Sequence, residues 1–460
     1  MARPDSRGAA DRARRVAFDA LRRVTGEDAY ANLVLPGLLT ERGITGRDAG
    51  FATELLNGTC RWLGTYDAVL VAASGRALSS LQPAVVDLLR LGTHQLLGMR
   101  VGSHAAVSAT VDLAGATVGR RVTGLVNAVL RRVAAHDLDG WVARLGEALP
   151  DERDRLGLAH AHPRWVVDAY ADSLPADELV AALAADNVSP EVSLVVRPGL
   201  AEVDEVLHEV GALGGAGELS RWSPFGVRTS GNPTDLPLVR TGRVGVQDEG
   251  SQLVAWGLTR PEAAPGTWLD LSAGPGGKTA LLAGLAAVQG SRVLAGELAP
   301  HRAGLVVNGA RAYPLDQRPQ VVVADATRPP WSPGSFTRVL ADVPCTGLGA
   351  LRRRPEARWR RSPDDVEALH PLQRALLSTA LDAAAPGALV GYVTCSPHRR
   401  ETVDVVEETL AGRGDVEVVP AAQVLPGVPD AATGPGGAFV QLWPHRHGTD
   451  AMFAAYLRRR

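Results

Sequence analysis

The sequence predicts a multidomain protein in which an all-α N-terminal domain precedes an α/β domain of the Rossmann type. Three observations lead to this prediction. The chain has 460 residues, which is more than a single hydrophobic core usually organises. Apolar residues recur at helical spacing through residues 11–136. After Gln247 short apolar runs alternate with helical stretches, a pattern typical of a parallel sheet with helices on both faces.

The N-terminal region owes its predicted helical structure to the spacing of its apolar residues. Val16, Leu21 and Val24 fall on one helical face, and a similar pattern recurs over residues 85–96. The next, proline-punctuated stretch also has a mainly helical pattern, and a small α/β unit is expected from Glu191. The expected domains are a helical domain at 1–140, a linker with a small α/β domain at 141–245, and a Rossmann-like domain at 246–460.

Five apolar runs are the predicted strands of the Rossmann-like domain. They occupy residues 267–271, 292–295, 320–324, 338–341 and 388–393. In such folds ligands bind beyond the carboxyl ends of the strands. Nearly every chemically suggestive residue of the chain follows one of these runs, so we expect the functional site at this edge of the sheet.

Composition indicates an ordinary globular protein of the cytoplasm. Hydrophobic residues make up 45% of the chain and charged residues 21%, and no apolar run reaches the roughly 18 residues of a membrane span. The polar residues 1–8 have no signal-peptide core behind them. Cys60, Cys345 and Cys395 are too few for a disulfide framework and suit a reducing compartment. A net charge of -2 means that any nucleic-acid partner must be argued from local patches.

A glycine-rich turn, SAGPGGKT at 272–279, follows the first predicted strand. Its glycines let the backbone pass close to a ligand, and the helix that begins there offers free N–H groups. Glu297 ends the second strand and can bind the two hydroxyls of a ribose. Asp325 ends the third strand and can accept from an adenine amine. Together these groups predict an adenosine-type site.

The same turn resembles the end of a phosphate-binding P-loop, in which Asp325 or Asp342 would hold magnesium. A P-loop requires glycine five residues before Gly277, and that position is Ser272. S-adenosyl-L-methionine has no phosphates, so the missing glycine favours this methyl donor. A P-loop NTPase remains an alternative.

Two of the three cysteines follow neighbouring predicted strands. Cys345 lies in DVPCTG at 342–347, and Cys395 lies in TCS at 394–396. Adjacent strands would bring both thiols to one crevice, with two buried structural thiols as the alternative. Metal binding is disfavoured because no Cys-x-x-Cys or histidine cluster completes a site.

Paired thiols suit methyl transfer to carbon 5 of cytosine. A thiolate that adds to carbon 6 makes carbon 5 nucleophilic, and the adduct must then lose the carbon 5 proton and expel the thiol. Asp342 can hydrogen-bond the cytosine. Lys278, the only lysine of the chain, can orient Asp342 or lower a thiol pKa.

Residues 351–361 combine six arginines with one tryptophan directly after the Cys345 motif. Guanidinium groups pair with phosphates and an indole can stack on bases, so we expect an RNA contact here, with a solvated basic helix end as the alternative. The target base must leave its stack to reach the thiol. The side chains expected to bind RNA are Arg352, Arg353, Arg354, Arg358 and Trp359, together with arginines of the helical domain.

The ordered set of motifs resembles the RNA cytosine-5 methyltransferase family of the Sun/RsmB/NOP2 type. The resemblance is carried by QDEGSQ at 247–252, SAGPGGKT at 272–279, DVPCTG at 342–347 and TCS at 394–396. It implies S-adenosyl-L-methionine as cofactor, with Cys395 as the nucleophile and Cys345 promoting product release. Asp342 and Lys278 complete the implied catalytic set. The positions implied to contact the cofactor are Ser272, Ala273, Gly274, Pro275, Gly276, Gly277, Lys278, Glu297, Arg302, Asp325 and Asp342.

The N-terminal half carries a related resemblance, to the NusB-like helical domain of the bacterial 16S rRNA branch of that family. The motifs are AYAN at 29–32, GLVNAVLRR at 124–132 and PRW at 163–165. They imply RNA binding by the helical domain and 16S rRNA as substrate. The departures from the usual family pattern, SAG at 272–274, Pro198 and DAMF at 450–453, remove no group that the mechanism needs. A tRNA methyltransferase and a non-enzymatic RNA-binding or antitermination factor are the remaining alternatives, and no metal is expected.

Overall fold

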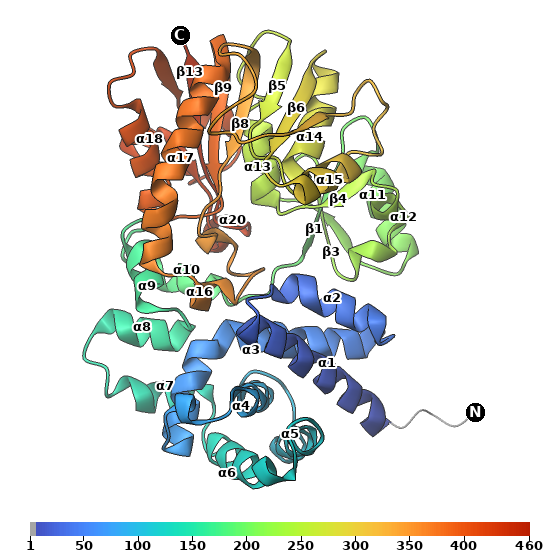
Figure 1. Ribbon diagram of the computed structural model, residues 1–460, viewed down its shortest axis with the longest axis vertical. Coiled ribbons are helices and arrows are strands. Elements are labelled where there is room, and N and C mark those ends of the chain that lie inside the picture. The colour runs from blue at the N-terminus through green and yellow to red at the C-terminus, as the bar shows by residue number, and fades with distance from the viewer. Residues whose placement is uncertain (1–5) are drawn as a thin grey trace. The chain divides into compact units, whose positions relative to one another are not determined.

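The computed structural model describes residues 6–460, with side chains from Arg12 onward. The prediction that residues 1–8 are not part of a signal peptide falls mostly on residues 1–5, which lie outside the described residues. The chain forms two compact units, which we call the helical unit (Met1–Val188 with Leu351–Arg361) and the α/β unit (Ser189–Ala350 with Ser362–Arg460). Figure 1 shows their elements. The sequence predicted three domains, with boundaries at residues 140 and 245. These boundaries differ from those of the two compact units, and the three-domain division stays a prediction.

The helical unit confirms the predicted all-α structure. The buried face of its first helix contains Val16, Leu21 and Val24, the residues whose spacing predicted it. Trp141 closes one end of the core and donates from Nε1 to the carbonyl of Val133 at 2.8 Å. The helices that the structure describes here are α1 (Ser6–Gly26), α2 (Ala31–Glu41), α3 (Gly46–Ser74), α4 (Pro83–Leu97), α5 (Ser103–Thr117), α6 (Thr123–Val133), α7 (Leu138–Gly146), α8 (Glu152–His160), α9 (Arg164–Ala171), α10 (Leu179–Ala185) and α16 (Ala357–Arg360).

A small antiparallel sheet opens the α/β unit, in the order β2-β3-β1-β4. The predicted strand and helix after Glu191 are confirmed as β1 and α11. Its elements are β1 (Val192–Val196), α11 (Val203–Ala212), β2 (Gly217–Leu219), β3 (Gly226–Thr229), α12 (Pro237–Arg240) and β4 (Val244–Val246).

The large sheet contains the five predicted strands as parallel neighbours, in the order β9-β8-β5-β6-β7. From the central strand β5 the chain places β6 and then β7 on one side. It then returns to place β8 and then β9 on the other side, as in a Rossmann fold. The strands are β5 (Thr267–Asp270), β6 (Arg292–Glu297), β7 (Gln320–Val323), β8 (Phe336–Asp342) and β9 (Ala384–Thr394).

Helices cover both faces of this sheet because successive strand residues point to opposite sides. Trp268 packs in one apolar cluster with residues of α13 (Glu249–Gly257) and α14 (Gly277–Val288). Its neighbour Leu269 packs in the other cluster, with residues of α17 (Pro363–Ala383) and α18 (Val403–Leu410). Helix α15 (Pro300–Gly309) contacts β6 and β7 at the sheet edge.

The five predicted strands are parallel, and the C-terminal residues add antiparallel strands that the sequence pattern did not predict. Strand β13 (Phe453–Arg459) pairs with β9, and β12 (Phe439–Gln441), β11 (Ala432–Thr433) and β10 (Val416–Val419) extend that side. The sheet is therefore mixed, with nine strands. Strand β13 is buried along most of its length. Because β13 pairs with one side of β9 and β8 with the other, β9 lies in the interior of the sheet.

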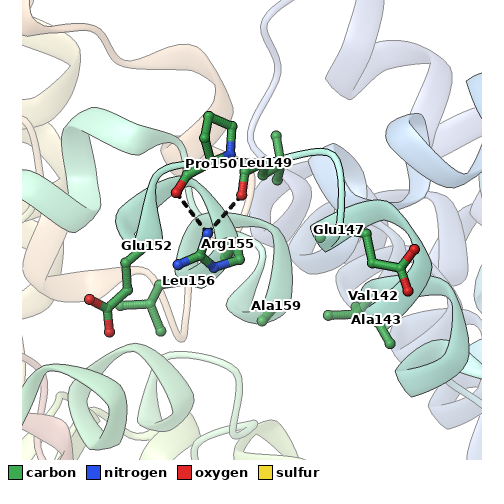
Figure 2. Close-up of a pocket in the computed structure, with 10 residues that line it drawn as sticks. Val142, Ala143, Glu147, Leu149, Pro150, Glu152, Arg155, Leu156 and Ala159 are labelled. Carbon is green, nitrogen blue, oxygen red and sulfur yellow. Dashed lines mark hydrogen bonds between the residues drawn. The ribbon is translucent and has the colours of Figure 1, made fainter.

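A surface groove of about 730 Å³ lies in the helical unit, along α7 and α8. Figure 2 shows its lining, in which Arg155 donates to the carbonyls of Leu149 and Pro150 at 2.7 and 2.8 Å. The groove lining contains no cysteine and no glycine-rich turn, so it is distinct from the predicted site. None of the helices within residues 6–460 combines the length and apolar character that crossing a membrane requires.

Candidate active site at the carboxyl ends of the parallel strands

The five parallel strands place all predicted catalytic and cofactor residues at one edge of the sheet. The glycine-rich turn follows β5, Glu297 ends β6 and Asp325 follows β7. Asp342 ends β8, with Cys345 in the loop behind it, and Cys395 follows β9. Because the order of strands reverses between β5 and β8, this edge is where a Rossmann fold forms its ligand crevice.

The glycine-rich turn is built for close backbone approach. Gly276 has φ +106°, a conformation that side chains disfavour, and a Cβ there would lie 2.9 Å from Cα of Val306. A Cβ on Gly274 would lie 2.3 Å from Oε2 of Glu297. Helix α14 begins directly at Gly277, so its free N–H groups face the turn.

Glu297 is buried, with 4% of its surface exposed, and its carboxylate organises this turn. Its Oε2 accepts from the N–H of Gly274 and its Oε1 from the N–H of Ala299, both at 2.9 Å. Arg302 Nη2 donates to the carbonyl of Gly274 at 2.5 Å and lies beside the same carboxylate. The second lone pair on each Glu297 oxygen can still accept from a ribose hydroxyl.

Asp325 is exposed and presents its carboxylate after β7. Its Oδ1 accepts from the hydroxyl and the N–H of Thr327 at 2.7 and 2.9 Å. These hydrogen bonds lower the pKa of Asp325 below its ordinary value, so the group is an anion at neutral pH. Two acidic acceptors beside an open glycine turn fit the ribose and adenine of S-adenosyl-L-methionine.

Among the turn residues themselves, the structure exposes some and buries others. Ala273 is buried, whereas Ser272 and Gly274 are partly buried and Pro275 and Gly277 are exposed. Gly274 and Pro275 are joined by a cis peptide bond. The predicted cofactor residues thus line one continuous segment between β5 and α14.

Lys278 reaches from the start of α14 to the end of β8. Its Nζ lies 2.8 Å from Oδ2 of Asp342. Burial disfavours the lysine charge, but the attraction of Asp342 outweighs it, so the pKa of Lys278 is raised. The predicted orienting contact between Lys278 and Asp342 is therefore present, and Lys278 is charged at neutral pH.

The two predicted catalytic thiols lie side by side, with 3.4 Å between Sγ of Cys345 and Sγ of Cys395. Both cysteines are partly exposed. The hydrogen bond with Cys395, reinforced by burial, raises the pKa of Cys345. Cys345 therefore stays protonated at neutral pH, and its S–H is placed to donate to Sγ of Cys395.

Gly349 is a structural determinant of this site that the sequence motifs do not reveal. It lies in the 3-10 helix η4 (Leu348–Ala350), where its N–H donates to the carbonyl of Cys395 at 2.9 Å. Its own carbonyl accepts from the N–H of Ala451 at 2.8 Å. A Cβ here would lie 1.9 Å from the Ala451 carbonyl oxygen, so only glycine lets these segments meet.

The QDEGSQ motif has a structural role in this unit. Asp248 caps α13 by accepting from the N–H of Gly250 at 2.9 Å, and it also accepts from the N–H of Asp450 at 3.0 Å. Glu249 accepts from the N–H of Ser223 at 2.8 Å. The motif therefore joins the small sheet and the C-terminal segment to the start of α13.

Asp270, at the end of β5, is a buried acid that the sequence motifs did not single out. Thr279 Oγ1 donates to its Oδ2 at 2.6 Å. Burial, partly opposed by this hydrogen bond, raises the pKa of Asp270 to about 7. Because the folded chain holds this proton while the unfolded chain releases it near pH 4, the group weakens folding increasingly as pH rises from about 4 to 7.

We therefore expect Asp270→Asn to change the pH dependence of stability. The asparagine keeps an acceptor for Thr279 but does not titrate. The variant should gain roughly 3 kcal/mol in free energy of unfolding, relative to the wild type, between pH 5 and pH 8. Urea unfolding of both proteins at the two pH values measures this difference. If the free energy of unfolding changed equally with pH in both proteins, the raised pKa of Asp270 would be contradicted.

The prediction that residues 351–361 grip RNA was wrong for Arg358, and Arg352 is buried as well. The chain leaves the α/β unit after Ala350, and this segment, which we call the arginine arm, folds as part of the helical unit. Arg358 is 0% exposed. Its Nη1 donates to the carbonyl of Ala161 and to Oδ1 of Asn187, at 2.9 and 2.8 Å. The guanidinium satisfies internal carbonyls rather than phosphates.

Trp359 is also packed inward rather than presented for stacking. Its Nε1 donates to the carbonyl of Cys60 at 2.8 Å, and a Cβ on Gly64 would lie 2.3 Å from its ring. Arg360 donates to backbone carbonyls of the loop that follows α1. Within the arm only Arg354 is exposed, and its guanidinium lies 5.7 Å from the ring centroid of Tyr30.

Comparison with known proteins agrees with this architecture. Residues 260–458 match the family described as 16S rRNA methyltransferase RsmB/F, and residues 11–135 match the NusB family. The chain is 52% identical to the Mycobacterium tuberculosis protein Rv1407, which carries a methyltransferase name, over 98% of this chain and 97% of that protein. It is 32% identical to ribosomal RNA small subunit methyltransferase B of Pseudomonas syringae, over 96% of each chain.

Solved structures show the same fold at lower identity. The crystal structure of PH0851 superposes with a TM-score of 0.81 at 23% identity and covers 100% of both chains. NSun6 from Pyrococcus horikoshii matches 65% of this chain and 99% of its own, with a TM-score of 0.54 and 16% identity. The family matches leave the P-loop NTPase and the non-enzymatic factor without support. The chain belongs to the RsmB/F family of S-adenosyl-L-methionine-dependent RNA methyltransferases, with a NusB domain ahead of its methyltransferase domain.

Proposed function

We propose that this protein methylates carbon 5 of a cytosine in 16S rRNA, through a covalent bond between Cys395 and carbon 6 of the base. The observation that carries the proposal is the 3.4 Å separation of the Cys345 and Cys395 sulfurs at the cofactor edge of the sheet. Transfer to an exocyclic nitrogen or a ribose hydroxyl needs no thiol, whereas transfer to carbon 5 needs a nucleophile that activates the ring.

Each group at the site has a defined task in this reaction. The Cys395 thiolate adds to carbon 6, and the electron pair released toward carbon 5 forms the new carbon–carbon bond. S-adenosyl-L-methionine, when bound, would supply the electrophilic methyl group, and its bond from sulfur to that methyl group would break to leave S-adenosylhomocysteine. Asp342, held by Lys278 at 2.8 Å, accepts a hydrogen bond from the exocyclic N4 amine of the cytosine and orients the ring. The ammonium of Lys278 offsets the negative charge that develops on the ring.

The cofactor is held by the segment between β5 and α14 and by the acids that follow β6 and β7. We assign the ribose hydroxyls to Glu297 and the adenine amine to Asp325. Arg302 keeps the turn in place through the carbonyl of Gly274. The remaining contacts come from the turn residues 272–278 and from Asp342.

Cys345 completes the cycle after methylation. Once the carbon 5 proton has passed to solvent water, the bond between Cys395 and carbon 6 breaks and Cys395 leaves as a thiolate. The Cys345 S–H, adjacent to that sulfur, stabilises the departing thiolate by a hydrogen bond.

Cys345→Ala should therefore let the adduct form but slow its release. We expect a covalent protein–RNA complex to accumulate with this variant and not with the wild type. Denaturing gel electrophoresis with labelled RNA detects the complex. If Cys345→Ala methylated RNA at the wild-type rate and no adduct accumulated, Cys345 would have no role in product release.

The substrate is small-subunit rRNA in this proposal, because residues 260–458 match the family described as 16S rRNA methyltransferase RsmB/F and the Pseudomonas relative is named a ribosomal RNA small subunit methyltransferase. We place the protein in the cytoplasm, where this RNA is found. Unmodified 16S rRNA and a tRNA pool offered in competition with labelled methyl donor test the choice. Methylation of tRNA alone would agree with the proposed reaction but would show that tRNA, and not 16S rRNA, is the substrate.

We assign RNA contact to exposed arginines of the helical unit, in line with the expectation for the helical domain. Arg120, Arg121, Arg131 and Arg132 are exposed around α6, and Arg354 is exposed on the arginine arm. Guanidinium groups of this kind pair with phosphates.

A further inference from the structure

The loops that carry the two thiols share one buried acceptor, the carboxylate of Glu401. Glu401 ends the 3-10 helix η5 (Arg399–Glu401), which follows the Cys395 motif, and its surface is 0% exposed. The sequence motifs gave it no role, and the reaction proposed above does not use it.

One side of the carboxylate binds the loop of Cys345. Thr346, the residue after Cys345, donates its N–H to Oε1 at 2.7 Å and its hydroxyl to Oε2 at 2.5 Å. Gln373 of α17 donates from Nε2 to Oε1 at 3.2 Å and to the carbonyl of Pro344 at 2.9 Å. The residues on both sides of Cys345 are thus held through Glu401 or its neighbour Gln373.

The same carboxylate binds the loop of Cys395. Ser396, the residue after Cys395, donates its hydroxyl to Oε2 at 2.6 Å. The backbone carbonyl of Glu401 accepts from the hydroxyl of Tyr392, in β9, at 2.8 Å. The position of Glu401 is therefore fixed by the same strand that delivers Cys395.

Four donors converge on the two oxygens of Glu401, and a carboxylate has enough lone pairs to accept from all of them. An amide of the same shape has one acceptor oxygen. Its NH₂ group can donate to the hydroxyls of Thr346 and Ser396, but the protons of these hydroxyls then lose their acceptor. Loss of such a bond in a buried site leaves unsatisfied groups, so the loops would shift to find other partners.

We propose that Glu401 is a positioning residue that sets the separation and orientation of the Cys345 and Cys395 thiols. It touches neither the base nor the cofactor and acts through Thr346 and Ser396. This inference rests on the proposed function. After the hydrogen bond with Cys395 and burial, the charge of Glu401 is a further influence that raises the pKa of Cys345, which agrees with a protonated Cys345.

Glu401→Gln tests the proposal. We expect kcat for RNA methylation to fall about 10- to 100-fold, because small displacements of reacting groups cost about this much. KM for RNA and Kd for S-adenosyl-L-methionine should stay within about threefold of wild type, since neither ligand contacts Glu401. Glu407→Gln, the same change at an exposed glutamate of α18, is the matched control and should leave kcat unchanged.

Thr346→Val removes the hydroxyl that donates to Glu401 and leaves Glu401 in place. This variant tests the proposal if Glu401→Gln does not fold. Alone it should lower kcat about threefold or more, and in the Glu401→Gln background it should add less than this, because both changes remove one interaction. Unchanged kcat in both single variants would overturn the proposal. A parallel loss of kcat, cofactor affinity and thermal stability would also overturn it, since it would show a general folding role. No transfer by the wild type would instead overturn the proposed function.

Discussion

Cys395→Ala should abolish methyl transfer to RNA, with a loss of at least about 10³-fold in kcat, because removal of a covalent nucleophile leaves only binding and orientation. Cofactor affinity should be unchanged, since the glycine turn, Glu297 and Asp325 are untouched. Transfer of the labelled methyl group from S-adenosyl-L-methionine to unmodified 16S rRNA measures the first quantity, and equilibrium binding measures the second.

Cys60→Ala is the matched control for this variant. Cys60 is buried in the helical unit, and burial raises its thiol pKa, so it is inert as a nucleophile. Its side chain lies in the apolar core, and its replacement should leave kcat unchanged. Residual methyl transfer by Cys395→Ala near the wild-type rate would show that Cys395 is not the nucleophile.

Arg358→Ala should destabilise the helical unit by about 3–5 kcal/mol, the usual cost of removing one member of a buried charged network. The guanidinium donates to the carbonyls of Ala161 and Asp186 and to the side chain of Asn187. The nearby carboxylate of Asp186 is also 0% exposed and accepts from the Tyr170 hydroxyl at 2.7 Å. Without Arg358 these buried acceptors lose their donors.

Thermal and urea unfolding of the full chain measure this effect, with Arg354→Ala as the matched control. Arg354 is exposed, so its replacement should change stability by no more than about 0.5 kcal/mol. A stable Arg358→Ala protein with weakened RNA binding would support an RNA grip at this position and contradict the internal role that the structure gives it.

Much of the fold could be predicted because it depends on local pattern. Apolar runs predicted β5 to β9, and residues that follow strands predicted that Cys345, Cys395, Glu297 and Asp325 would share one edge. Helical spacing similarly predicted α1. These inferences need only the rule that parallel strands end together.

The rest depends on contacts between distant segments. Nothing local distinguishes the buried Arg358 from an RNA-binding arginine, because its acceptors are carbonyls of residues 161 and 186. Glu401 and Gly349 likewise owe their roles to loops brought together by folding. Strand β13 was missed because it pairs antiparallel with β9, outside the alternating strand–helix pattern.

The central claim is covalent catalysis at carbon 5 of cytosine, and release of tritium from that carbon tests it most directly. Unmodified 16S rRNA transcribed with [5-³H]cytidine is incubated with the wild-type protein and S-adenosyl-L-methionine. The account predicts one tritium released to water for each methyl group transferred, and none with Cys395→Ala. Methyl transfer without tritium release would place the methyl group on another atom and contradict the account.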